Sequence, residues 1–254
     1  MLVNYLGKLT HKIAAWKWIH SSWAFAVILP AWLAVGLSLS LFVIYALLYA
    51  LQFAGVSFAS IDATVFNSAI AALLYILTLS FVIGLPWLFR KYTTWQEIGL
   101  SRLPSWSDIG LAPVGFIMYF LASALLIYIV SQIFPVFDIS QSQETGFTRL
   151  SQSYEYILAF ATLIIIAPAA EELLFRGFLY GKLRKRMPVW IAILITSVFF
   201  GLAHGQWNVG LDVFVLSLVL CGLREVTGNI WAGMLLHMLK NAIAFFIIFI
   251  APVL

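Results

Sequence analysis

The chain has 254 residues, of which 63% are hydrophobic and only 9% are charged, and its mean hydropathy is +1.03. Because a soluble domain carries roughly 25% charged residues, these values exclude an ordinary soluble protein and predict a polytopic membrane protein. The net charge of +4 comes from basic residues grouped in short loops, which indicates membrane topology rather than a nucleic-acid partner. The single cysteine, Cys221, excludes an intrachain disulfide.

Residues 1–22 are too charged to cross a membrane. Their apolar residues nevertheless recur at helical spacing along one stripe, at Leu2, Leu6, Leu9, Ile13 and Trp16. This pattern predicts an amphipathic helix in the membrane interface. The competing interpretation is a cleavable signal peptide, but the apolar run that follows is longer than the ~7–15 residues of such a signal. We therefore expect the interfacial helix to stay attached.

Seven apolar runs follow, and each predicts a transmembrane helix. They cover approximately residues 23–53, 69–89, 110–134, 154–181, 189–207, 211–223 and 230–250. At ~1.5 Å per residue most of them can cross a hydrocarbon layer of ~30 Å. The sixth run is short, so we expect it to extend to Gly228, to tilt, or to thin the bilayer locally. The predicted fold class is an all-α polytopic membrane protein with about seven transmembrane helices.

The basic residues also predict the orientation. If the N-terminus is cytoplasmic, most of the 14 Lys and Arg residues fall on the inner side, as the positive-inside rule requires. We expect an integral, multi-pass protein of the cell (inner) membrane that contacts its lipids. Three regions are predicted: the interfacial helix at 1–22, N-terminal transmembrane helices at 23–150, and helices that carry the chemistry at 151–254.

The fourth run contains charged residues in the stretch APAAEELLFRGFLYGK, residues 167–182. Glu171, Glu172 and Arg176 facing lipid would cost about 8–10 kcal/mol, at roughly 2.5–3.5 each, so they must face protein or a wet cavity. Glu172 and Arg176 are four residues apart and can pair, whereas Glu171 points about 100° away. Pro168 is expected to bend the helix there. The alternative is an ionic cluster that only locks helices together, but buried pairs stabilise poorly.

Two later runs carry polar residues of their own. His204 follows Phe200 by one turn in the fifth run, and His237 and Asn241 lie four apart on one face of the last run. Both histidines also have a purely structural interpretation. A lone histidine such as His204 can be a packing residue, and His237 and Asn241 can donate hydrogen bonds to neighbouring helices. Counted from the inner loops at ~1.5 Å per residue, Glu171, His204 and His237 lie at similar depth, so one site near the bilayer midplane is predicted.

The three elements in this order, Glu171-Glu172-x-x-x-Arg176, Phe200-x-x-x-His204 and His237-x-x-x-Asn241, resemble the CPBP family, which includes type II CAAX prenyl proteases and bacterial Abi-type proteins. The resemblance covers about the last two fifths of the chain. It implies an intramembrane endopeptidase in which Glu171, helped by His204, activates water. His237 and Asn241 would face the developing oxyanion, and Arg176 with Glu172 would hold the site in shape. Asn208 also stands four residues after His204, but Asn241 follows the family order.

The metal requirement stays open at this point. Glu171, His204 and His237 are ligand types that catalytic zinc accepts, and members of the family are often classed as metalloproteases. A mechanism without a cofactor is preferred, because Asn241 beside His237 resembles an oxyanion donor pair. Zinc bound by these three residues is the alternative.

Two other classes of function compete with the protease. One is a membrane immunity or binding protein of the same fold, and the other is a proton-coupled transporter. A transporter would be favoured by inverted repeats, and none is apparent in the sequence. The predicted substrate is a peptide or protein; whether it is prenylated depends on the substrate's own C-terminus.

Overall fold

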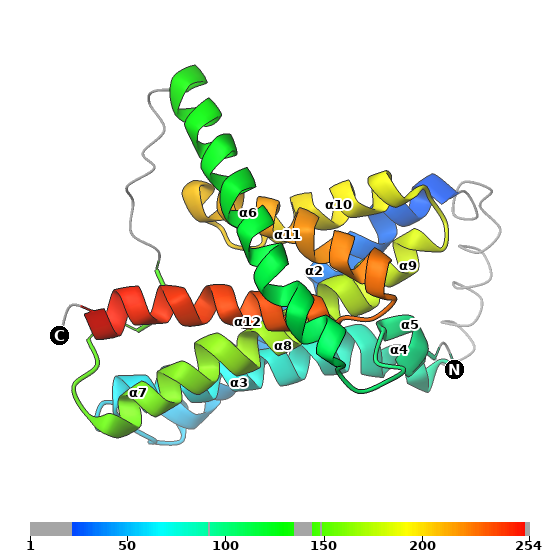
Figure 1. Ribbon diagram of the computed structural model, residues 1–254. Helices are drawn as coiled ribbons and strands as arrows, with labels where there is room; N and C mark the ends of the chain where they lie inside the picture. The colour runs from blue at the N-terminus through cyan, green and yellow to red at the C-terminus, as the bar shows by residue number, and fades with distance from the viewer. Residues whose placement is uncertain (1–21, 91, 135–143, 148, 252–254) are drawn as a thin grey trace, which may run out of the picture.

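The computed structural model describes residues 22–90, 92–134, 144–147 and 149–251, and every regular element within these ranges is helical. The predicted interfacial helix lies outside them, except for its last residue. The major helices are Phe25–Phe53 (α2), Ala63–Leu79 (α3), Trp106–Ile133 (α6), Ser153–Phe160 (α7), Ala167–Glu171 (α8), Val189–Leu202 (α10), Trp207–Thr227 (α11) and Trp231–Phe245 (α12). Short helices at Leu85–Leu88 (α4), Trp95–Ile98 (α5) and Gly181–Arg184 (α9) complete the bundle (Figure 1).

All seven predicted runs are helical, and the protein is a polytopic all-α membrane protein. Five helical stretches in the described ranges are long and apolar enough to cross a membrane: Phe25–Phe53, Ala63–Leu88, Trp106–Ile133, Ser153–Arg184 and Trp231–Ile250. The apolar helix Val189–Leu202 is shorter. That α10 and α11 also cross the membrane, which would give seven crossings in total, therefore stays a prediction.

Local chemistry explains where the helices begin and end. Asp62 starts α3 earlier than predicted, because its carboxylate accepts hydrogen bonds from the backbone N–H groups of Thr64 and Val65. The sixth run extends to Thr227 and is capped by Gly228, whose φ of 68° suits glycine. The fifth run is shorter than predicted: α10 ends at Leu202 rather than continuing to residue 207.

The helix that carries the glutamates is continuous from Ser153 to Arg184 but irregular. π-helical stretches at Ala161–Ile166 (η4) and Glu172–Tyr180 (η5) lie on either side of Pro168. Proline lacks a backbone donor and disturbs the i→i−4 ladder, and π-helical turns are frequent at functional sites. The helix is thus widened on both sides of Pro168, and the bend expected at Pro168 stays a prediction.

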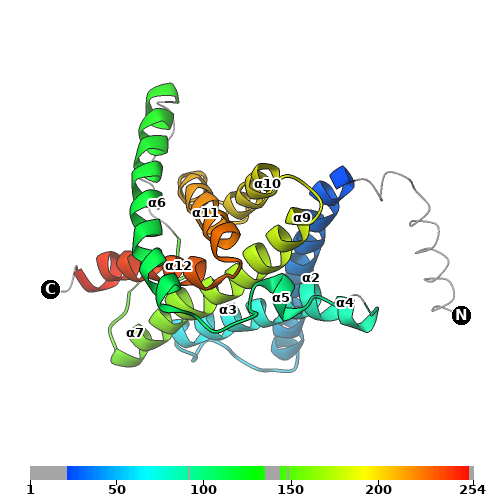
Figure 2. The ribbon, with the colours of Figure 1, turned by 45° about the vertical axis from the view of Figure 1, so that its right-hand side comes forward.

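This irregular helix lies at the centre of the bundle. Figure 2 shows α10 and α11 on one side of it and α3 on the other. Its η5 part is buried from Leu174 to Tyr180, in a hydrophobic cluster that includes Leu29 and Leu33 of α2 and Phe200 of α10. The second half of α6 instead extends beyond the other helices in both views (Figures 1 and 2).

The short helix α5 docks on the end of the central helix, where glycines allow close contact. A Cβ at Gly177 would lie 2.7 Å from Ile98, and one at Gly181 would lie 2.8 Å from the Glu97 carbonyl oxygen. Glu97 pairs with Lys185, and Arg224 donates to the Glu97 carbonyl at 3.1 Å. Several basic residues of the predicted inner loops thus lie at the same end of the bundle.

Candidate functional site

Glu172, Arg176 and His237 form a buried ionic cluster. Arg176 Nη1 donates to Glu172 Oε1 at 2.9 Å, and both side chains are fully buried. His237 Nδ1, on α12, lies 3.0 Å from the same oxygen. Since a carboxylate oxygen accepts, Nδ1 carries the proton, and the other ring nitrogen, Nε2, is turned away from Glu172. The predicted pairing of Glu172 with Arg176 is present, and it orients His237.

Glu171 is the more accessible carboxylate of the pair, with 17% of its side chain exposed. Its Oε2 lies 3.8 Å from His237 Nε2, so the ring of His237 stands between the two glutamates. Its Oε1 accepts a hydrogen bond of 2.6 Å from the hydroxyl of Tyr75 on α3. Glu171 therefore faces a histidine nitrogen that Glu172 does not occupy, as a general base would.

The ring of Phe200 joins the charged groups of the site. The guanidinium carbon of Arg176 lies 4.2 Å from its centroid, an arrangement that stabilises a desolvated cation. The rings of His204 and His237 pack edge-on against Phe200, with centroid distances of 4.9 Å and 5.9 Å. Phe200 thus brings His237 and the glutamate helix together, and His204 lies one turn after Phe200 in the same segment.

The position of His204 in the fold differs from the prediction. It lies in the turn after α10, followed by Gly205 at a φ of 70°, and not within a transmembrane helix. Its Nδ1 lies 2.8 Å from the carbonyl oxygen of Phe200. Because a carbonyl only accepts, Nδ1 donates, and the unprotonated nitrogen of the neutral ring is Nε2.

Asn241 lies one turn beyond His237 on α12, and its amide donates to the carbonyl oxygen of Leu163 in η4 at 2.9 Å. It lines a small cavity of about 50 Å³ together with Leu163 and Lys240. One N–H of the amide is thus occupied by backbone, and none of the other candidate site residues lines this cavity. The later His-x-x-x-Asn pair is the one that meets the glutamate helix.

The structure does not bring Glu171, His204 and His237, the metal set considered from the sequence, into one three-residue cluster. Within the described ranges, no three His, Cys, Asp or Glu side chains group closely enough to hold a metal ion. Nδ1 of His237 faces Glu172 and Nδ1 of His204 faces a backbone carbonyl, so Nε2 is the remaining nitrogen of each ring.

Two residues of the site escaped the sequence reasoning. Tyr75 lies in an apolar span with no motif, and nothing local connects it to Glu171. Gly233 could have been noticed, because it stands one turn before His237 on the same face of α12. A Cβ at Gly233 would lie 3.4 Å from Glu172 Oε2, an ordinary contact distance, so α12 passes next to the glutamate with room for only a small side chain at this position.

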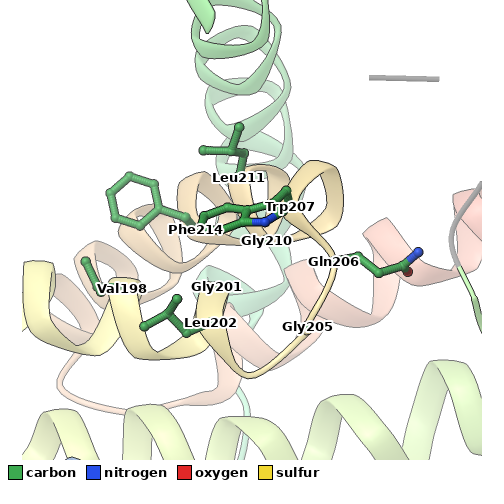
Figure 3. Close-up of a pocket in the computed structure, with 9 residues that line it drawn as sticks. All are labelled: Val198, Gly201, Leu202, Gly205, Gln206, Trp207, Gly210, Leu211 and Phe214. Atoms are coloured by element: carbon green, nitrogen blue, oxygen red, sulfur yellow. The ribbon is translucent and has the colours of Figure 1, made fainter. Parts of the chain in front are cut away.

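An apolar pocket of about 290 Å³ lies apart from the polar cluster, between the end of α10 and the start of α11. Figure 3 shows Leu202, Trp207 and Phe214 around it, whereas the side chain of Gln206 points away. Gln206 instead accepts a hydrogen bond from the Glu144 backbone. None of the candidate site residues lines this pocket, although its lining residues Gly201 and Gly205 are sequence neighbours of Phe200 and His204.

Comparison with known proteins supports the resemblance seen in the motifs. Residues 153–243 match the family model described as "Type II CAAX prenyl endopeptidase Rce1-like". This segment contains every candidate site residue found from the sequence. No solved structure matches the chain.

Curated relatives match over similar lengths. An "Uncharacterized 24.3 kDa protein" of Escherichia coli is 36% identical over 89 residues, which cover 33% of this chain and 41% of the relative. The "Putative membrane peptidase YdiL" of Bacillus subtilis is 27% identical over 42% of this chain and 43% of the relative. The "UPF0177 protein YxdF" of Lactococcus lactis is 25% identical over 50% of this chain and 71% of the relative. The match thus spans less than half the length of the first two relatives.

Proposed function

Residues 153–243 carry the sequence pattern of the Rce1-like type II CAAX prenyl endopeptidases, and we propose that this chain is an intramembrane endopeptidase with a glutamate-activated water. The observation that carries the proposal is the pair formed by Glu171 Oε2 and His237 Nε2, 3.8 Å apart within an apolar bundle. Charged groups so deep in a membrane protein are costly and typically functional.

Each polar group can be given a role in hydrolysis. Glu171 takes a proton from water, whose oxygen attacks the peptide carbonyl to give a tetrahedral intermediate. His204, whose Nε2 is free to accept, helps to move that proton to the leaving amine. The protonated form of His237 and the second N–H of Asn241 stabilise the oxyanion. Glu172 and Arg176 hold His237 in place.

A mechanism without a metal is part of the proposal. Titration of the purified protein with zinc and with a chelator tests it: we expect a chelator to leave the cleavage rate unchanged and zinc to give no stoichiometric activation. Loss of activity with the chelator, restored by zinc, would show instead that the glutamate and histidines rearrange around a metal.

The proposed substrate is a peptide segment that reaches the site from the membrane. An apolar pocket of about 330 Å³, lined by Leu79, Trp87, Trp95, Ile98 and Leu173 among others, lies beside the central helix. Its lining includes Leu79, one turn after Tyr75 on α3, and Leu173 of the central helix. It can accept an apolar group of the substrate, whether an amino-acid side chain or a prenyl chain.

The protein is proposed to lie in the inner membrane of the cell. Its N-terminus is proposed to face the cytoplasm. The end of the bundle that holds Arg102, Lys185 and Arg224 would then face inward. Accessibility of a cysteine introduced at Arg184 to a membrane-impermeant reagent, compared between intact and opened cells, tests this arrangement. Labelling in intact cells would reverse it.

Cleavage of a membrane-associated reporter peptide tests the function itself. Glu171→Gln should abolish cleavage while the protein still accumulates in the membrane. Glu225→Gln, a carboxylate at the end of α11 outside the site, is the matched control and should retain activity. Protection against a peptide toxin without any cleavage would support the immunity protein instead.

A further inference from the structure

The hydroxyl of Tyr75 makes the shortest described contact to the site. It donates to Glu171 Oε1 at 2.6 Å, across 96 positions of sequence. Tyr75 belongs to α3, outside the segment 153–243 that matches the family model. A hydrogen bond from a neutral hydroxyl to a carboxylate is charge-assisted and short. The N-terminal helices therefore contribute a group to the site that no motif contains.

This contact distinguishes the two oxygens of Glu171. Tyr75 occupies Oε1, whereas Oε2 faces His237. Glu172 is fixed by both Arg176 and His237, whereas Tyr75 is the one hydrogen-bond partner of the Glu171 side chain among the residues that the structure describes. A glutamate side chain with several rotatable bonds needs such a partner to keep one orientation.

We propose that Tyr75 is a positioning residue, whose hydroxyl holds Glu171 so that Oε2 is the oxygen presented to the attacking water beside His237. This inference rests on the proposed function, because it concerns the base of that reaction. Tyr75 does not touch the reacting atoms; it acts through Glu171.

Helix α3 is itself fixed well enough to transmit this constraint. Thr78, one turn after Tyr75, hydrogen-bonds Ser40 of α2 at 3.1 Å, and both side chains are buried. Asp62 caps the start of α3. The tyrosine thus belongs to a capped helix whose last turn is attached to α2, which limits the movement of its hydroxyl relative to the central helix.

The chain contains a matched control. Tyr119 of α6 donates to Asp212 Oδ1 of α11, also at 2.6 Å. This pair also joins a tyrosine hydroxyl to a carboxylate on another helix, and Asp212 has two further partners, Ser123 and Lys240. Replacing either tyrosine by phenylalanine removes one hydroxyl from a tyrosine–carboxylate pair, but only Tyr75→Phe acts on the proposed base.

The first test measures cleavage of the reporter peptide. We expect Tyr75→Phe to lower kcat by about 10- to 100-fold, as expected when a reacting group is misplaced by about 1 Å, with KM unchanged. Tyr119→Phe should leave kcat within about twofold of the unmodified protein. If Tyr75→Phe retains full kcat, or if it raises KM alone, the positioning role is wrong.

The second test needs no substrate, so it separates failure of this inference from failure of the proposed function. The melting temperature in detergent is measured for Tyr75→Phe, Glu171→Ala and the double variant. We expect Tyr75→Phe to lower the melting temperature of the unmodified protein but not that of Glu171→Ala, because the acceptor is already gone. An equal decrease in both backgrounds would overturn the contact, whether or not the protein cleaves peptides.

Discussion

His237 Nδ1 and Arg176 Nη1 donate to a single oxygen atom, Glu172 Oε1, at 3.0 Å and 2.9 Å. One fully buried carboxylate therefore links the central helix to α12 and sets which nitrogen of His237 faces Glu171. The other oxygen, Oε2, has no hydrogen-bond partner among the described residues, and neither do Arg176 Nε and Nη2. Glu172 and Arg176 depend on each other's charge, because both side chains are fully buried.

Removing the arginine should therefore be costly. Arg176→Met leaves Glu172 buried without its cation, and breaking such a pair costs about 3–5 kcal/mol of unfolding free energy. Arg184→Met is the control, because Arg184 pairs with Glu225 at a partly exposed position, where a salt bridge contributes roughly 0–1 kcal/mol. Unfolding in mixed detergent micelles measures both. Equal losses would contradict the buried cluster.

The size of residue 233 should decide whether α12 reaches the glutamate. At Gly233 a Cβ would meet Glu172 Oε2 and a side-chain carbon of Leu220 at ordinary contact distances, both 3.4 Å. Gly233→Ala should thus be tolerated, whereas the larger side chain of Gly233→Leu should push α12 away, at a cost of about 1–3 kcal/mol from overpacking. The leucine variant should also lose peptide cleavage. Tolerance of leucine in both measurements would show that this approach is not needed.

Phe200 should matter through its aromatic face as well as its volume. Phe200→Leu removes the ring below Arg176, and a desolvated cation–π contact contributes about 2 kcal/mol. Phe245 is also buried and packed edge-on against another phenylalanine, but no cation of the described residues lies over its ring. We expect Phe200→Leu to reduce unfolding free energy by roughly 2 kcal/mol more than Phe245→Leu. An equal reduction would indicate packing alone.

The docking of α5 should depend on pH. The hydrogen bond from Lys185, followed by that from the Thr94 backbone N–H, lowers the pKa of Glu97. A carboxyl whose pKa is lowered by folding adds stability above its unfolded pKa of about 4.3, and this contribution disappears as the pH falls through the folded pKa. Glu97→Gln should thus have a lower melting temperature than the unmodified protein at pH 7.

The same comparison at acidic pH provides the control. Below the folded pKa of Glu97, the carboxyl is neutral in both states, so the difference in melting temperature between Glu97→Gln and the unmodified protein should vanish. A difference that stays constant from pH 7 to pH 3 would show that the charge of Glu97 does not hold α5 against Lys185.

Local pattern was sufficient for much of the fold. Long apolar runs predicted the helices because an uninterrupted hydrophobic stretch must be buried in lipid or protein. The pairing of Glu172 with Arg176 followed from four-residue spacing on one helix. The end of α10 at Leu202 was missed, because the apolar pattern continues past it and the turn at Gly205 depends on how α10 meets α11.

The amino-acid sequence by itself determined that the chain is helical and membrane-embedded, that three charges on one helix must face the protein interior, and that Glu172 can reach Arg176. Only the tertiary structure decided which partners come from other helices: Tyr75 to Glu171, His237 to Glu172, and Asn241 to the Leu163 carbonyl. The physical reason is that spacing along a helix sets which side chains share its face. The depth and rotation at which two helices meet depend instead on packing contacts between residues far apart in the chain, such as the close approach at Gly233.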